Sequence, residues 1–286
     1  MKTMKPKEII KMFIDDYGEM FGIDKELALI EAHNLVGKCN RNKYDESLIV
    51  EVKRIEKEWY DALMEGDPDY SCYDDDYYFI DLITCFVTYS RSYLRTIENP
   101  KSYDGNTSLF EFLGEVNKVA DLGCGMGYTS AYLKEIWPNS EVYGTNIKNT
   151  KQYQFCEKVS SDYDFSIVED TTQIGKGVDF VFASEYFEHF ENPMEHLDKV
   201  IEDMQPNYLF LANSFNTYSI GHFTSYKHGE EIIPQKFISR AFNNHLSQKG
   251  YQQVKTKVWN NKPALWVRNP TNDANSKVNK GSTTQD

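Results

Sequence analysis

The spacing of hydrophobic positions changes at about residue 108. Beyond it, short apolar runs of strand length alternate with longer stretches in which apolar residues recur at helical spacing. This alternation predicts an α/β fold with a mostly parallel sheet and helices on both faces. The expected strands cover residues 116–122, 141–147, 165–170, 178–183 and 208–212. The runs 253–259 and 264–267 predict an antiparallel hairpin at the sheet edge.

The first hundred residues carry helical spacing throughout. Helices are expected at residues 6–15, after Asp24, at 47–64 and at 79–97. We therefore predict an N-terminal helical region (1–105) that covers the site or binds substrate, a principal domain (106–268) and a disordered polar tail (269–286).

The segment 66–78 combines turn residues with acids and tyrosines. Acids at the start of a helix favourably meet its dipole, which is the structural interpretation. The alternative is an acidic, aromatic pocket, because carboxylates and tyrosine rings suit a cationic or amine-bearing ligand.

Three glycines at alternate positions follow the first expected strand, in the stretch Asp121-Leu-Gly-Cys-Gly-Met-Gly127. A backbone that turns sharply and lets a ligand lie against it cannot carry Cβ atoms. The amides at the start of the following helix provide donors for an anionic group. Dinucleotide binders show a different spacing, Gly-x-Gly-x-x-Gly, and any tight turn from strand to helix also favours glycine.

The glycine pattern resembles motif I of the class I S-adenosylmethionine-dependent methyltransferases. After the fourth expected strand, Glu185-Tyr-Phe-Glu188-His189 is similar to a signature of the metabolite-type branch of that superfamily. The resemblance covers residues 108–268. It implies a Rossmann-like sheet of seven strands, mostly parallel with an antiparallel final strand, and S-adenosylmethionine as cofactor.

The same resemblance assigns roles to residues of the first strand tips. Gly123, Gly125 and Gly127 would hold the methionine end of the cofactor, and Asp121 would anchor the turn. Asn146 stands where the family usually has an acid that binds the ribose. An amide lacks the charge, so the bond is expected to be weaker by about 1 kcal/mol, and Asn146→Asp is expected to tighten binding.

Further roles fall on the later strand tips. Asp170 would accept from the adenine amino group, and Glu185 would shape the loop near the sulfonium. Glu188 and His189 are the candidate catalytic residues. A neutral imidazole at position 189 could act as a general base or could orient the loop, and both interpretations remain open.

The helix after this stretch has marked ends. Asn192 is expected to cap it, with Pro193 first and Glu195 completing the cap. The motifs that DNA amino-methyltransferases and cytosine-C5 enzymes place after strand 4 do not occur there.

Charge and composition limit the partners and cofactors that the protein is expected to bind. The formal net charge of −13 opposes attraction to a polyanion. The five cysteines and six histidines show no metal-ligand spacing, so no metal is predicted. The sequence lacks both a signal peptide and a membrane-length apolar run, and a cytoplasmic protein without a membrane partner is expected.

The sequence therefore predicts an enzyme that methylates an oxygen, nitrogen or carbon nucleophile of a small molecule. Two alternatives remain: a nucleic-acid or modified-nucleotide methyltransferase, and a non-catalytic binding module that keeps the fold. The acceptor and the oligomeric state are left open.

Overall fold

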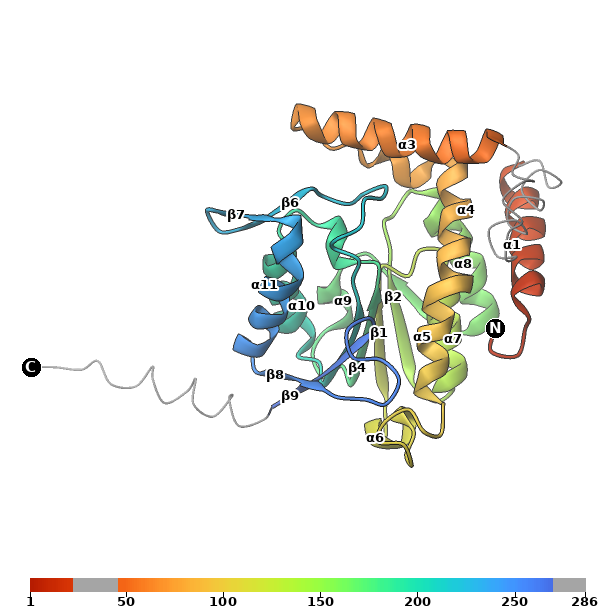
Figure 1. The fold of residues 1–286 in the computed structure, drawn as a ribbon. Coiled ribbons are helices and arrows are strands. Elements are labelled where there is room, and N and C mark those ends of the chain that lie inside the picture. The colour runs from red at the N-terminus through yellow and green to blue at the C-terminus, as the bar shows by residue number, and fades with distance from the viewer. Residues whose placement is uncertain (23–45, 270–286) are drawn as a thin grey trace, which may run out of the picture.

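The structure is a computed structural model that describes residues 1–22 and 46–269 (Figure 1). The helix expected after Asp24 and the expected tail from residue 270 lie outside the described residues. The described part contains no helix that is long and apolar enough to cross a membrane.

A seven-stranded sheet forms the centre of the molecule, in the order β3-β2-β1-β4-β5-β9-β8. The first five strands of this order pair in parallel, whereas β9 runs antiparallel to both β5 and β8. The strands are β1 (Lys118–Leu122), β2 (Glu141–Thr145), β3 (Ser166–Val168), β4 (Phe180–Ser184), β5 (Tyr208–Ala212), β8 (Tyr251–Val254) and β9 (Ala264–Arg268). This confirms the predicted fold class, including the antiparallel strand.

Helices cover both faces of the sheet (Figure 1). One face carries α7 (Tyr128–Ile136), α8 (Lys151–Tyr163) and a continuous rod made of α4 (Asp76–Cys85), the π-helical turn η2 (Phe86–Ser90) and α5 (Arg91–Ile97). The other face carries α9 (Thr171–Ile174), α10 (Pro193–Met204) and α11 (Gln235–Gln248). The short α6 (Leu109–Leu113) precedes β1 and has a capping box between Ser108 and Glu111.

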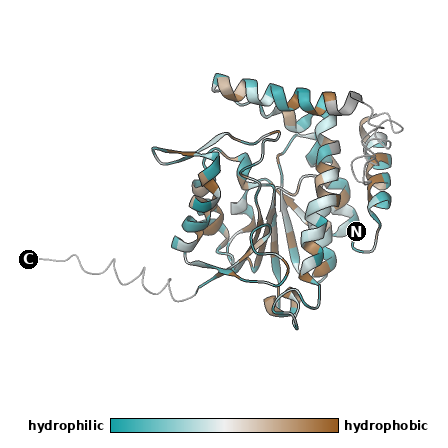
Figure 2. Ribbon diagram, viewed as in Figure 1, coloured by the Kyte–Doolittle hydropathy of each residue, from teal (hydrophilic) through white to brown (hydrophobic). Residues whose placement is uncertain are grey.

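Successive side chains of β4 point to opposite faces of the sheet and pack into two separate hydrophobic cores. Phe180 and Phe182 point into the core on the α7 side, whereas Val181 and Ala183 point into the core on the α10 side. All four side chains are fully buried. In Figure 2, brown hydrophobic stretches run along these central strands, as expected for parallel strands covered on both faces.

The N-terminal helices close over the edge where the parallel strands end. Helix α1 (Pro6–Phe21) packs beside α4 and α8, and α3 (Glu46–Glu65) crosses the top of the view in Figure 1. The buried Trp59 of α3 donates from Nε1 to the carbonyl of His222 at 2.8 Å. The 3-10 helix η1 (Tyr70–Asp74) docks on the start of α8, because Asp74 accepts from the backbone N–H of Lys151 at 2.7 Å.

Three local features differ from the sequence expectation. The helix expected from residue 79 begins three residues earlier, with Asp75 as its N-cap. Residues 225–234, where the sequence predicts no strand, form a hairpin of β6 (Ser225–His228) and β7 (Glu231–Pro234). Asn192 stands at the N-cap of α10 and Pro193 is its first residue, as predicted, but the Asn192 side chain makes no cap hydrogen bond. Its ψ of 68° departs from the extended conformation in which a cap side chain reaches the helix amides.

Candidate functional site

Asp121 holds the glycine turn from beneath. Its Oδ2 accepts hydrogen bonds from the hydroxyls of Thr129 at 2.5 Å and Ser130 at 2.6 Å, at the start of α7. The Gly123 N–H donates to the Thr145 hydroxyl at 2.8 Å, which ties the turn to β2. Burial raises the pKa of Asp121 to about 7, while the two hydroxyl bonds oppose the shift. The geometry thus suits an anchor for the turn.

Gly123 and Gly125 both adopt positive φ, +67° and +52°, and both line cavities. A Cβ on Gly123 would lie 2.5 Å from the Tyr186 ring, so that ring rests directly on the glycine backbone. A Cβ on Gly125 would meet only the Gln152 side chain, at 3.9 Å. Gly125 therefore faces open space that a ligand can occupy.

Gly127 has a different surrounding. It is the N-cap of α7 at φ +85°, and a Cβ there would lie 2.9 Å from both Cys156 Sγ and Phe165 Cζ. It is not among the lining residues of the two cavities described below. Glycine is required at position 127 because a side chain there would overlap Cys156 and Phe165 in the core.

A cavity of about 580 Å³ runs across the ends of β1, β2 and β3. Its volume lies within the range typical of small-molecule sites. Its walls include Gly123, Gly125, Asn146, Asp170, Glu185 and, from η1 and α4, Tyr70, Tyr73 and Tyr78. Three tyrosines of the segment that suggested an aromatic pocket therefore line this cavity, while Asp75 of the same segment caps α4.

Asn146 is 8% exposed and uses its side chain within the protein. Its Nδ2 donates to the carbonyl of Gly125 at 2.7 Å, and its Oδ1 accepts from the N–H of Ile147 at 2.8 Å. The amide thus joins the tip of β2 to the glycine turn. It still lines the larger cavity.

Asp170 lies at the tip of β3 and begins α9. Its carboxylate accepts from the Thr172 N–H at 2.9 Å and forms an ion pair with Lys199 at 2.6 Å. These contacts, the Lys199 bond first, lower the pKa of Asp170 to about 2. The group is therefore ionised at neutral pH and borders the same cavity.

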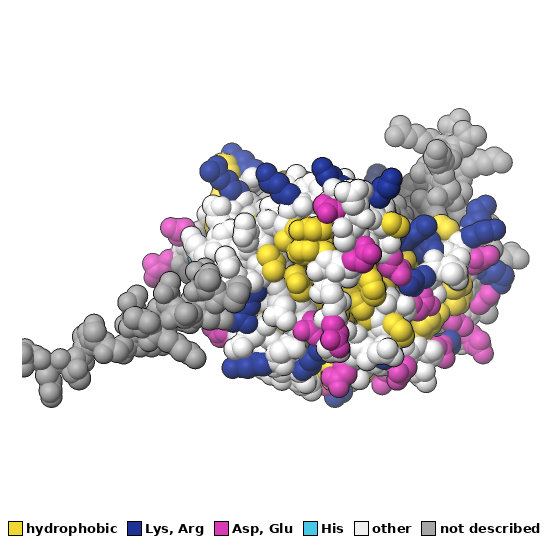
Figure 3. Space-filling view, turned by 90° about the horizontal axis from the view of Figure 1, so that it is seen from below, with side chains coloured by type: hydrophobic (Ala, Val, Ile, Leu, Met, Phe, Trp, Pro, Cys, Tyr) yellow, Lys and Arg dark blue, Asp and Glu magenta, His cyan; other side chains and the backbone are white. Residues whose placement is uncertain are grey.

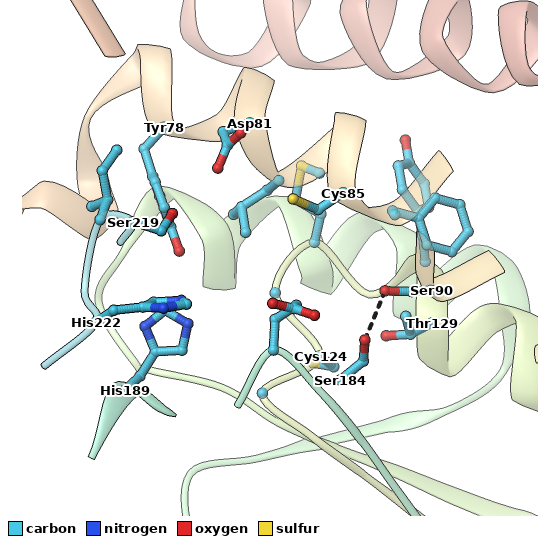
Figure 4. Close-up of a pocket in the computed structure, with 18 residues that line it drawn as sticks. Tyr78, Asp81, Cys85, Ser90, Cys124, Thr129, Ser184, His189, Ser219 and His222 are labelled. Atoms are coloured by element: carbon cyan, nitrogen blue, oxygen red, sulfur yellow. Dashed lines mark hydrogen bonds between the residues drawn. The ribbon is translucent and has the colours of Figure 1, made fainter. Parts of the chain in front are cut away.

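A smaller cavity, of about 120 Å³, lies between the glycine turn and α4 (Figure 4). Tyr78 and Asp81 project into it from α4, and His189 and His222 lie on the opposite side. Asp81 has no hydrogen bond or ion pair to the part of the chain that the structure describes. Burial raises its pKa to about 6, with Glu185 adding to the shift.

The two glutamates after β4 differ in position. Glu185 adopts φ +52°, lines both cavities and forms an ion pair with Lys262 at 2.5 Å. Glu188 is fully buried, and one of its oxygens accepts from the Ser214 N–H at 2.5 Å. Burial and then the charge of Glu185 raise the pKa of Glu188 to about 8. Glu188 is not among the lining residues of either cavity.

His189 lines both cavities and is held from two sides. Its Nδ1 lies 2.9 Å from the Tyr73 hydroxyl, and its ring meets that of His222 edge-on at 4.8 Å. Burial, followed by the neighbouring His222, lowers the pKa of His189 to about 3. The imidazole is neutral at physiological pH and is a weak proton acceptor.

Sequence reasoning named Gly123, Gly125, Asn146, Asp170, Glu185 and His189, which the structure gathers around these cavities. The sequence predicts no role for Asp81 or His222. Asp81 lies on a helix face and His222 lies in a polar loop, and neither local pattern distinguishes a functional residue. Only the fold brings them to the same cavity.

The sheet order, the antiparallel β9 and a cavity across the glycine turn are those of the class I methyltransferase fold. The family model described as a methyltransferase domain matches residues 95–256, more than half of the chain. The chain therefore belongs to the methyltransferase domain family. Comparison with curated proteins gives no match.

Comparison with solved structures also finds methyltransferases. An O-methyltransferase family protein from Burkholderia thailandensis is 12% identical, with 92% of this chain and 93% of that chain covered and a TM-score of 0.51. Mitomycin 7-O-methyltransferase MmcR is 11% identical over 92% and 93% of the two chains, with a TM-score of 0.49. Plantazolicin methyltransferase BpumL, in complex with SAH, is 17% identical, with a TM-score of 0.38. That match covers 58% of this chain and 62% of BpumL, less than two thirds of its length.

Proposed function

We propose that this enzyme methylates a small molecule, with the donor in the larger cavity and the acceptor in the smaller one. The observation that carries the proposal is that the two cavities meet. Their shared walls are Tyr78, Leu82, Gly123, Gly125, Glu185 and His189. A donor and an acceptor held in adjoining cavities are aligned without the entropy loss of a random encounter.

The residues fit the donor. The open space at Gly125 accepts a chain against the bare backbone, which suits the methionine end. Asn146 and Asp170, at the next two strand tips, would face the ribose and the adenine. Gly127 and Asp121 would shape the turn without touching the ligand. When bound, S-adenosylmethionine supplies a methyl group already made electrophilic by its sulfonium.

The protein's own contribution is then alignment and exclusion of water. The N-terminal helices cover the strand tips, and Glu185 stands where the two cavities meet. Because the pKa of His189 lies near 3, we assign it to positioning through the Tyr73 hydroxyl, and not to proton removal. Glu188 supports the loop from beneath.

Charge favours a small molecule over a nucleic acid. Among the residues that line the larger cavity, four are acids (Glu169, Asp170, Glu185 and Glu191) and one is a lysine (Lys148). Lys148 pairs with Glu169, and the other three acids are paired with lysines outside the lining, so no basic surface remains there. On the face shown in Figure 3, basic and acidic side chains are interspersed. A phosphate backbone needs a basic surface along its path.

Calorimetric titration with S-adenosylmethionine tests donor binding, and a screen of acceptors for released S-adenosylhomocysteine tests turnover. Mass spectrometry of co-purifying ligands supplies the first acceptors to try. Binding without turnover on any small molecule, together with salt-sensitive binding of oligonucleotides, would favour the nucleic-acid alternative. No heat at millimolar donor with folded protein would favour the non-catalytic module.

A further inference from the structure

Two carboxylates and an imidazole converge beside the smaller cavity. Glu185 follows β4, Glu188 lies in the 3-10 turn η3 (Phe187–His189), and His222 comes from the loop between β5 and β6. Each offers one ligand atom, and these atoms lie within 4.8 Å of one another. Atoms that share one metal ion at about 2.1 Å lie up to roughly 4.2 Å apart, so a small inward shift brings the three onto one ion.

Glu188 gives the first independent sign of a ligand. Its side chain is fully buried, one oxygen accepts from Ser214, and the other oxygen, Oε2, has no hydrogen-bond partner in the described structure. A polar oxygen of a fully buried carboxyl group is unfavourable without a partner, whether the group is charged or protonated. The Lys262 ammonium is paired with Glu185, which leaves one cation for two carboxylates.

His222 gives the second sign. Its Nδ1 lies 2.8 Å from the carbonyl oxygen of Thr217. A carbonyl only accepts, so Nδ1 carries the proton and Nε2 keeps its lone pair. A backbone carbonyl that fixes one ring nitrogen is how proteins orient a histidine for metal binding through the other.

We propose that Glu185, Glu188 and His222 bind a first-row divalent cation such as Mn²⁺, and that this cation holds the acceptor through oxygen. The inference rests on the proposed function and narrows its acceptor. Carboxylates suit Mn²⁺ and an imidazole suits neighbouring first-row ions, so the mixed set selects this class. Three protein ligands leave coordination positions open, and Glu185 and His222 line the smaller cavity. Two neighbouring oxygens, such as vicinal hydroxyls, fill two of those positions.

The bound cation would lower the pKa of the acceptor hydroxyl. A hydroxyl bound to a divalent cation loses its proton to solvent water far more readily than a free one. The resulting oxygen attacks the methyl carbon, an O–CH₃ bond forms as the S–CH₃ bond breaks, and sulfur keeps the bonding pair. The products are the methyl ether and S-adenosylhomocysteine.

The test is a Mn²⁺ titration of the full chain after treatment with a chelator, followed by the electron paramagnetic resonance of free Mn²⁺. One ion per chain is expected. Glu188→Gln and His222→Gln are expected to weaken binding at least tenfold. The amide introduced by Glu188→Gln retains an oxygen that accepts from Ser214, so the variant should fold. Glu230→Gln, at an exposed hairpin turn, is the matched control and should bind as the unaltered chain does.

Lys262→Gln provides a test with the opposite sign. It removes the ammonium that competes for Glu185, so Mn²⁺ should bind several-fold more tightly. If the cluster is merely structural, no variant strengthens binding. Absence of a bound ion at 1 mM Mn²⁺, or equal affinity in Glu188→Gln, overturns the proposal.

The same preparations are titrated with S-adenosylmethionine. The Mn²⁺ titration tests the cation site, and the donor titration tests the proposed function. If the chain binds S-adenosylmethionine but not Mn²⁺, the proposed function stands and the cation site is wrong. If it binds Mn²⁺ but not S-adenosylmethionine, the cation site stands and the proposed function is wrong.

Discussion

The two ends of the site are built in opposite ways. The donor end is a short continuous stretch in which backbone and glycine form the binding surface, with Asp121 satisfied by two hydroxyls beneath it. The acceptor end is assembled from α4, η3 and the loop after β5. Asp81 projects into its cavity without a described partner, and Glu188, buried beside it, has one oxygen without a partner. The donor end therefore satisfies its buried acid within the protein, whereas the acceptor end does not.

The largest expected effect breaks the donor end. Gly125→Val places a branched side chain in the larger cavity, and S-adenosylmethionine affinity should fall at least a hundredfold. Position 125 also has a positive φ, which is strained for valine, so we expect the substitution to lower the free energy of unfolding by about 1–3 kcal/mol. Calorimetry and urea unfolding measure the two effects. Unchanged affinity would show that the donor does not lie against this glycine.

Gly127→Ala is the control for that experiment. Its φ is also positive, but its Cβ would meet Cys156 and Phe165 in the core. We expect a loss of roughly 2–4 kcal/mol of unfolding free energy from strain and overpacking together. The folded fraction should keep its donor affinity within about twofold. A large affinity loss would contradict the different roles of the two glycines.

This contrast also explains how much of the molecule could be predicted from sequence. The strands, the glycine turn and the order of helices follow from local periodicity and from residues close together in the chain. Asp81 and His222 are 141 residues apart, and no spacing rule connects them. Their meeting depends on α4 lying across the strand tips, which is a tertiary fact.

Some missed features did carry a local signal. The β6–β7 hairpin turns at Gly229 and Glu230, a glycine-containing turn of hairpin length, but its strands are only four residues long. The sequence predicts no metal, because its cysteines and histidines lack a metal-ligand spacing, and the cation site proposed above would not produce one. A cluster built from two nearby glutamates and a histidine 34 residues later gives no such spacing.

A second prediction concerns the acceptor end. Burial raises the pKa of Asp81 to about 6, so the folded protein binds its proton more tightly than the unfolded chain does. This group's contribution to stability is fully present below the unfolded pKa of about 4 and is lost as pH rises through about 6. Asp81→Asn should therefore raise the unfolding free energy at pH 8 by roughly 1–3 kcal/mol, with little gain at pH 4.

Urea unfolding at both pH values measures this difference. Asp67→Asn, on an exposed turn, is the control and should change stability by less than about 0.5 kcal/mol at either pH. A destabilised Asp81→Asn protein would mean that the carboxylate has a partner in solution. The acceptor end would then resemble the donor end, and the comparison would fail.

The smallest expected effect lies at Asn146, where the contacts in the structure lead to the opposite prediction from the one drawn from the sequence. The family's usual acid suggested that Asn146→Asp would tighten donor binding. In the structure Nδ2 donates to the Gly125 carbonyl at 2.7 Å, and an aspartate would place an oxygen against that carbonyl. Losing this bond costs about 1 kcal/mol, so the glycine turn should loosen and donor affinity should fall about fivefold.

Asn149→Asp adds the same charge at an exposed position three residues away and controls for electrostatics alone. Tighter binding by Asn146→Asp but not by Asn149→Asp would show that the ribose contact outweighs the bond that holds the turn.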